Sequence, residues 1–171
     1  MATDGKNLSA YDPESLRAAS GLKIGLVVSA WNEEITEALL QGAKSALIDT
    51  GFPEENIPIV RVPGSFELPL ACQLLIDNDT VDAVVAIGSV IRGETPHFEY
   101  VCQAVSQGIK DVGLKSGIPV IFCVLTDNTI EQSRDRSGGK HGNKGVEAAV
   151  AAVKMAVLRK NLREDWGTGL L

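Results

Sequence analysis

LKIGLVVSAWNEEITEALLQGAKSALIDTG, residues 22–51, pairs a buried strand with the helix that follows it. Its first part, Leu22–Ala30, is a short and nearly continuous apolar run, which is typical of a strand covered on both faces. Asn32 is a suitable N-cap, and Gly51 closes the helix that we expect between them. The apolar residues of this helix recur at spacings of three and four and predict its buried stripe. They are Ile35, Ala38, Leu39, Gly42, Ala43, Ala46 and Leu47.

The same alternation of strand and helix continues along the chain. Further strands are predicted at 57–62, 81–88 and 118–125. Helices are predicted at 66–76, with Pro69 in the first turn, at 96–112, at 130–136 and at 146–163. The predicted buried face of the 96–112 helix consists of Phe98, Val101, Cys102, Val105 and Ile109. Four strands separated by helices predict an α/β fold with a four-stranded parallel sheet in a three-layer α/β/α sandwich.

The strand and helix pattern extends over a single domain. Residues 1–20 lack an apolar period and are expected to form a flexible arm, followed by a single domain over 21–171. The glycine-rich segment 137–145 can cradle an anion or form a kink between two helices, and the immediate return of helical periodicity favours the kink.

Charge and cysteine content restrict the kind of partner and the compartment. The net charge of −6 over 171 residues gives no basic field for nucleic acid, and the cations near the C-terminus are expected to face water. The three cysteines lie far apart within apolar runs and are expected to be buried free thiols of a reducing compartment. No signal peptide and no membrane-spanning run is recognisable. A soluble, cytoplasmic protein without membrane or nucleic-acid partners is therefore expected.

Unusual residues follow the predicted strands, where ligands gather in parallel α/β folds. Trp31 follows the first strand, PGSFE (63–67) the second and SVIRGETPH (89–97) the third, while Phe122 lies within the fourth. Aromatic rings at this edge can stack on a flat ligand, and the Glu67 carboxylate can accept hydrogen bonds from it. The pattern alone favours core positions for Phe66 and Phe122, because apolar residues of helices and strands are usually buried.

His97 and its neighbours suit proton transfer beside an anion. Imidazole titrates near neutral pH, and the helix N-terminus next to Thr95 offers unpaired amides to a phosphate. A structural role for His97 is equally compatible with its position. No nucleotide-binding glycine motif follows any strand, and the two histidines have no acidic or thiol ligands at metal spacing, so neither a nucleotide cofactor nor a metal is expected.

Three motifs together resemble the lumazine synthase family. PGSFE (63–67), IGSVIRGETPHF (87–98) and GNKG (142–145) occur in matching order and spacing, within similarity that extends from about Leu22 to Leu162. The resemblance implies a flavodoxin-like sheet. It also implies condensation of 5-amino-6-(D-ribitylamino)uracil with 3,4-dihydroxy-2-butanone 4-phosphate, giving 6,7-dimethyl-8-ribityllumazine, phosphate and water without a cofactor.

The resemblance also implies a role for each site residue. The residues implied to hold the pyrimidine and its ribityl chain are Trp31, Ser65, Phe66, Glu67, Ser89, Val90, Ile91 and Phe122. The butanone phosphate is implied to bind Arg136 and the backbone amides of Glu94 and Thr95. His97 is implied to be the catalytic, proton-transferring residue, and Lys144 is an additional candidate.

Assembly is a further implication of the resemblance. The helix 146–163 carries apolar residues around much of its circumference, which predicts a second partner for it. Beside its stripe of Ala149, Val150, Val153 and Val157, the second apolar face is expected to consist of Ala148, Ala151, Ala152 and Ala156. The resemblance implies pentamers with active sites at subunit interfaces, in which Arg136 reaches into a neighbour's site. Because the 137–145 segment carries no insertion, we expect twelve pentamers to form an icosahedral 60-subunit capsid. The N-terminal arm is expected to add a strand to a neighbouring subunit's sheet, and association with riboflavin synthase is implied.

Two other functions compete with the enzyme. A flavodoxin-like binding module would stack a flavin or pterin on Trp31 and Phe66 without catalysis, and loss of His97 would leave it intact. A shell-forming structural protein would carry a vestigial site, which the presence of Glu67, Thr95, His97 and Arg136 argues against.

Overall fold

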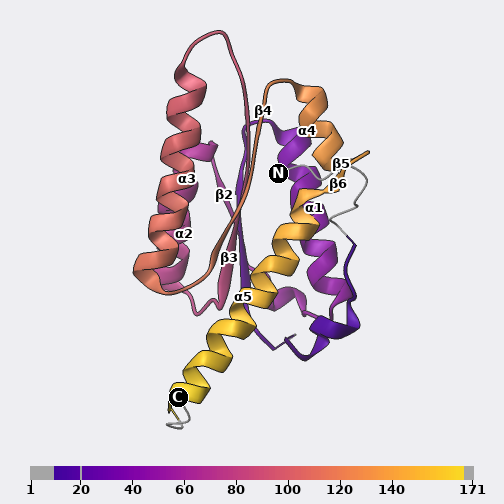
Figure 1. The fold of residues 1–171 in the computed structure, drawn as a ribbon, viewed down its shortest axis with the longest axis vertical. Helices are drawn as coiled ribbons and strands as arrows, with labels where there is room; N and C mark the ends of the chain where they lie inside the picture. Colours follow the sequence, from indigo (N-terminus) through magenta and orange to yellow (C-terminus); the bar gives the residue numbers. More distant parts are fainter. Residues whose placement is uncertain (1–9, 20, 168–171) are drawn as a thin grey trace.

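Four parallel strands in the order β2-β1-β3-β4 form the centre of the molecule (Figure 1). The computed structural model describes residues 10–19 and 21–167. The strands are β1 (Ile24–Ser29), β2 (Ile59–Val62), β3 (Ala83–Ile91) and β4 (Val120–Asp127). β1 lies in register with both neighbours, with Leu26 opposite Ile59 on one side and Val85 on the other. The predicted parallel α/β architecture is confirmed.

Helices cover both faces of the sheet (Figure 1). α1 (Glu33–Asp49) and α5 (Lys144–Gly167) pack on one face, and α2 (Leu68–Asn78) and α3 (His97–Ser116) pack on the other. Each face of the sheet has its own hydrophobic core, and successive strand residues belong to alternate cores. Leu26 and Val28 pack in the core with α1 and α5, whereas Val27 packs in the core with α2 and α3. The apolar runs of β1 and β3 are explained by this double burial.

The predicted boundaries shift by a few residues where local geometry intervenes. A 3-10 turn at Ser65–Glu67 precedes α2, and Pro69 lies in the first turn of that helix, as expected from its missing amide. β3 extends three residues beyond its predicted end, to Ile91, because β4 pairs with it up to Asp127. α4 (Ile130–Arg136) lies where it was predicted.

Asn32 stands immediately before α1 but does not cap the helix with its side chain. Its backbone is left-handed, with φ of 58°, and its Nδ2 donates to the carbonyl oxygen of Ser89 at 2.9 Å. The N-cap prediction is wrong in this respect, because a bond to the neighbouring strand replaces the bond to the helix amides. Asn32 therefore ties the β1–α1 loop to the end of β3.

The glycine-rich segment is a small hairpin rather than a kink. β5 (Ser137–Gly139) and β6 (Gly142–Asn143) pair in antiparallel fashion between α4 and α5. The Asn143 amide donates to the carbonyl oxygens of Ala38 at 2.9 Å and Ser137 at 3.2 Å, which fixes the hairpin against α1. The kink prediction is corrected, since this long-range anchoring is not encoded in local periodicity.

The N-terminal segment is partly folded onto the body. Residues 1–9 and 20 of the predicted arm lie outside the described residues. A 3-10 helix, η1 (Glu14–Ala19), buries Leu16 and Ala19 in the core beside α1 and α5. This part of the predicted flexible arm therefore differs from the expectation.

The alanines of α5 do not form the second apolar face that was predicted from sequence. Ala148, Ala152 and Ala156 are buried against the chain's own core. A different set of apolar side chains is exposed along the helix, with exposed fractions of 41–48%. They are Met155, Leu158 and Leu162. The C-terminal part of α5 extends beyond the sheet and the other helices (Figure 1).

The three cysteines are free thiols, as predicted. Cys72 and Cys123 are buried and Cys102 is half-buried. Burial raises the pKa of the Cys72 and Cys123 thiols to about 12, so they remain protonated and unreactive at neutral pH. Among the helices of residues 10–19 and 21–167, none combines the length with the apolar character that a membrane-spanning segment needs.

Candidate active site

A cavity of about 380 Å³ opens at the carboxyl ends of β1, β2 and β3. Its lining comes from the loops after β1 and β2, the end of β3 and the start of α3. The lining residues are Trp31, Asn32, Gly64, Ser65, Phe66, Ser89, Val90, Ile91, Gly93, Thr95, His97, Phe98 and Val101. Eight of the residues selected from sequence therefore meet at one place.

Two aromatic side chains flank this cavity and remain open to solvent. Trp31 is 73% exposed and Phe66 is 61% exposed. The core position that the pattern favoured for Phe66 is wrong, because the 3-10 turn before α2 directs this residue outward. Exposed rings of this size lose water contact when a flat ligand stacks on them, which stabilises binding.

Two buried hydroxyl groups contribute to the cavity lining. Ser65 and Ser89 are 6% and 2% exposed, and no described residue forms a hydrogen bond with either hydroxyl. Gly88 makes this arrangement possible, since a Cβ at that position would lie 2.6 Å from Ser65 Oγ. Buried hydroxyls of this kind are available to a polar ligand.

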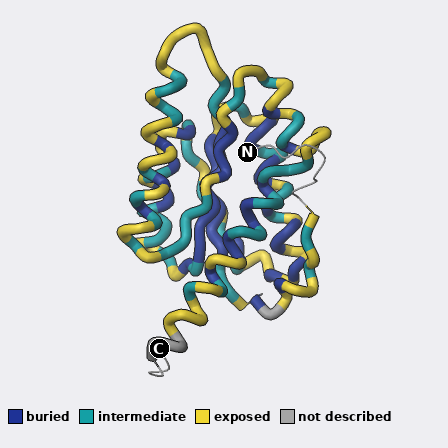
Figure 2. Tube along the Cα trace, in the orientation of Figure 1, coloured by how far each residue is buried: buried dark blue, intermediate teal, exposed yellow. Residues whose placement is uncertain are grey.

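His97 is the first residue of α3 and its side chain is exposed at the cavity. Glu94 and Thr95 precede it in an exposed loop, which is the high arch between β3 and α3 in Figure 2. Thr95 lines the cavity, and amides at the very start of α3 have no carbonyl partner in a preceding turn, whereas the Glu99 amide donates to the Pro96 carbonyl at 3.1 Å. This corner combines a proton-transferring group with donors suited to an anion.

Glu67 lies beside the cavity but does not line it. Its Oε2 atom is close to Gly64, where an added Cβ would approach it to 3.1 Å. Gly64 itself lines the cavity. The carboxylate is therefore near enough to accept a hydrogen bond from a ligand that extends past Gly64.

Three candidate residues lie away from this cavity. Phe122, 39% exposed on β4, contributes to a larger groove of about 880 Å³ between α3, β4 and α5. Arg136 is half-buried at the last position of α4. Lys144 Nζ lies 2.6 Å from Glu147 Oε2 in an ion pair. The single chain therefore does not bring these three side chains together with the eight candidates that line the cavity.

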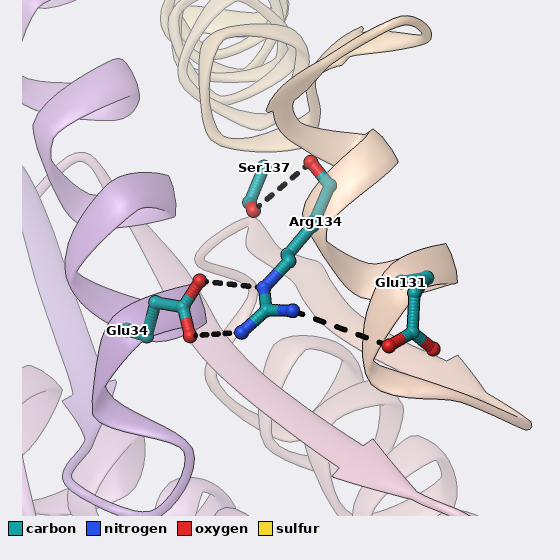
Figure 3. Close-up of polar contacts among 4 residues, drawn as sticks. All are labelled: Glu34, Glu131, Arg134 and Ser137. Atoms are coloured by element: carbon teal, nitrogen blue, oxygen red, sulfur yellow. Dashed lines mark hydrogen bonds and ion pairs between the residues drawn. The ribbon is translucent and has the colours of Figure 1, made fainter.

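An ion pair fixes α4 to the start of α1 (Figure 3). Arg134 Nε and Nη2 donate to the two carboxylate oxygens of Glu34 at 2.7 and 2.9 Å, and the Ser137 hydroxyl donates to the Arg134 carbonyl at 3.4 Å. The hydrogen bonds from Arg134 lower the pKa of Glu34. A bidentate contact restricts orientation more than a single bond does, so α4 and the nearby Arg136 are held relative to the loop of Trp31.

Five of the lining residues were not predicted from the sequence as site residues. They are Asn32, Gly64, Gly93, Phe98 and Val101. Phe98 and Val101 were assigned to the buried face of α3, but they are only half-buried because the cavity opens beside the first turns of that helix. The four-residue spacing between His97 and Val101 gave a signal for the cavity, since helix residues four apart share a face.

No cluster of metal-ligating side chains is present in residues 10–19 and 21–167. No group of three or more histidine, cysteine, aspartate or glutamate side chains is placed to hold an ion.

Comparison with known proteins shows a close relationship along almost the whole chain. The family model described as 6,7-dimethyl-8-ribityllumazine synthase matches residues 21–160. A protein of that name from Christiangramia forsetii is 58% identical over 164 residues, covering 95% of this chain and 98% of the relative. The Flavobacterium johnsoniae protein is 55% identical, covering 94% and 84%, and the Porphyromonas gingivalis protein is 51% identical, covering 94% and 99%.

Proposed function

The chain belongs to the 6,7-dimethyl-8-ribityllumazine synthase family and acts as a transferase in riboflavin biosynthesis, and on this premise we propose that the cavity at the carboxyl ends of β1, β2 and β3 is its active site. The observation that carries this proposal is the convergence of exposed aromatic rings, unpartnered buried hydroxyls and His97 in one cavity.

The pyrimidine occupies the part of the cavity between Trp31 and Phe66. Stacking on these rings orients the flat heterocycle, and the hydroxyls of Ser65 and Ser89 bind its polar edge. Val90 and Ile91 complete the wall, and the Glu67 carboxylate beside Gly64 accepts hydrogen bonds from the ribityl hydroxyls. These roles are supported by exposed aromatic surface and by hydroxyls that lack other partners.

The butanone phosphate occupies the corner next to α3. Its phosphate accepts hydrogen bonds from the backbone amides of Glu94 and Thr95, aided by the helix N-terminus. The 5-amino group of the pyrimidine attacks the ketone to form a Schiff base, and loss of phosphate, ring closure and dehydration complete the product. Because the site holds both reactants together, proximity supplies most of the rate advantage.

His97 transfers protons during these steps, and its replacement by alanine is expected to lower kcat at saturating substrates. The loss is expected to be at or below about 100-fold, the lower end of the usual range for acid–base assistance. Amine and ketone condense even without acid–base assistance, and the variant still holds the two reactants together. Steady-state kinetics measured by lumazine fluorescence test this. Substrate affinity is expected to change little.

His141→Ala is the matched control, since it removes the only other histidine, which is exposed in the β5–β6 hairpin away from the cavity. It is expected to retain wild-type turnover. Wild-type turnover in His97→Ala would eliminate the proton-transfer role.

We also propose that each active site is shared between neighbouring subunits. Phe122 and Arg136 lie outside the cavity of their own chain, and the apolar groove that Phe122 lines is suited to a second copy of the chain. Packed in this groove, a neighbour would receive Phe122 as a further stacking surface and Arg136 as a bidentate phosphate ligand. Lys144, held by Glu147, is assigned a secondary electrostatic role.

The assembly proposed is a closed ring of five, with twelve rings forming a 60-subunit capsid. The short β5–β6 hairpin supports closure of the capsid, as the family resemblance implies for chains without an insertion. β2 and β4 are the two edge strands of the sheet, and an edge strand has unpaired backbone groups that accept a neighbour's N-terminal strand. We extend the proposal to association with riboflavin synthase and, given three free thiols, to the cytoplasm.

A further inference from the structure

Arg92 lies at the junction between β3 and the loop that leads to His97. Its backbone amide donates to the Asp127 carbonyl at 3.0 Å, which continues the pairing with β4 beyond the last residue of β3. The side chain that leaves this anchored backbone is 43% exposed and is not part of the cavity lining. Its position is therefore fixed while its guanidinium remains close to the site.

The guanidinium contacts three side chains that belong to two other parts of the fold. Its Nε donates to Asn128 Oδ1 at 2.9 Å in the loop between β4 and α4. Its Nη1 donates to the carboxylate of Glu99 in the first turn of α3, and its centre lies 4.3 Å from the ring centroid of Phe98. Arg92 thus joins the end of β3, the start of α3 and the β4–α4 loop.

Residues 93–96 form the arch between two of these anchored points. Gly93 and Thr95 line the cavity, as does Phe98, on which the guanidinium stacks. Asn128 lies just before α4, the helix that carries Arg136. The backbone amide of Asn128 donates to Gln132 Oε1 in that helix at 2.8 Å. One side chain therefore contacts both the segment that presents amides to this chain's own cavity and the segment that leads to Arg136, which serves the neighbouring subunit's site.

The Glu99 carboxylate receives its side-chain hydrogen bond from Arg92. One of its oxygens accepts from Arg92, whereas Oε2 is buried and has no hydrogen-bond partner among the described residues. Hydrogen bonding from Arg92 lowers the pKa of Glu99. A planar guanidinium can satisfy Glu99, Asn128 and the Phe98 ring at once, which the single ammonium of lysine cannot.

We propose that Arg92 is a positioning residue that holds the 93–96 loop and the β4–α4 loop in the geometry required to bind the phosphate of the sugar substrate. The inference deepens the proposed function and rests on it. Arg92 acts through the loops and Phe98, without contacting the substrate.

The test compares Michaelis constants for the two substrates in Arg92→Ala. The constant for 3,4-dihydroxy-2-butanone 4-phosphate is expected to rise about tenfold or more, because small displacements of binding groups are costly, while that for the pyrimidine stays within about twofold. Arg92→Lys is expected to recover part of this loss. Asn128→Ala is expected to give a smaller change in the same direction, which provides a second variant should Arg92→Ala fold poorly.

Arg17→Ala is the matched control, since Arg17 forms an exposed ion pair with Glu14 at 2.7 Å in η1, away from the cavity. It is expected to match the wild type in both constants. Unchanged constants in Arg92→Ala, or equal increases in both together with a lowered Tm, would overturn the positioning role. Failure of the proposed function is distinguishable, since the wild type itself would then form no lumazine.

Discussion

A chain carrying both Leu114→Asp and Leu158→Asp is expected to sediment as single subunits and to lose catalytic efficiency by roughly 100-fold or more. Both leucines line the groove between α3, β4 and α5 and are 74% and 48% exposed in the single chain. Their replacement should therefore leave the fold intact, whereas burying two carboxylates against a neighbouring subunit is strongly unfavourable. Loss of a neighbour's Phe122 and Arg136 accounts for the effect on catalysis.

Sedimentation velocity and lumazine formation, measured on the same samples, test this prediction. Ile48→Asp is the control, because Ile48 is 41% exposed on α1 and does not line the groove. The wild type and the control are expected to sediment as capsids of 60 subunits. Free wild-type pentamers would refute the capsid alone, and a fully active monomeric double variant would refute the shared active site.

Gly145→Ala is expected to destabilise the fold severely, with a loss of unfolding free energy on the order of 3 kcal/mol or more. A Cβ at this position would lie 1.9 Å from the carbonyl oxygen of Leu39 and 2.9 Å from Asn143 Oδ1. The first of these atoms belongs to the backbone of α1 and cannot rotate away. The start of α5 would have to move off α1, and the β5–β6 hairpin with it.

Chemical denaturation followed by circular dichroism measures this loss. Gly21→Ala is the matched control, since a Cβ there meets no atom within 4 Å of its position, and its stability should remain close to that of the wild type. A Gly145→Ala protein with the unfolding midpoint of the wild type would show that α5 approaches α1 less closely than described.

The architecture could be predicted because each element of it is encoded locally. The apolar run of β1 and the three-and-four spacing in α1 are short-range patterns, and the chain needs only right-handed crossovers to arrange four such strands in parallel. The positions after the strands then identified the edge of the sheet where the cavity lies.

Features that depend on distant partners were not predicted. Asn32 bonds to Ser89 across 57 positions instead of capping its helix, and Asn143 bonds to Ala38 across 105 positions and so stabilises a hairpin within a glycine-rich segment. Phe66 carries an apolar side chain at a helix start, where only the actual turn geometry determines that it faces outward.

The location of Phe122 illustrates a second kind of limit. Its strand was predicted, but the groove that it lines is formed by side chains of α3, β4 and α5, which are distant in sequence. The exposed face of α5 was likewise assigned to alanines, whereas Met155, Leu158 and Leu162 form it. Helical periodicity gives the residues that share a face, and the packing of the neighbouring elements determines which face is covered.

The emission of Trp31 gives the most direct test of the claim that the pyrimidine binds in this cavity. The chain has two tryptophans, so Trp166→Phe leaves Trp31 as the only indole, at the cavity wall. Titration with 5-amino-6-(D-ribitylamino)uracil is expected to quench this emission to saturation at one ligand per chain, with a midpoint close to the Michaelis constant for that substrate. An active Trp166→Phe enzyme whose Trp31 emission does not change at saturating pyrimidine would contradict the account.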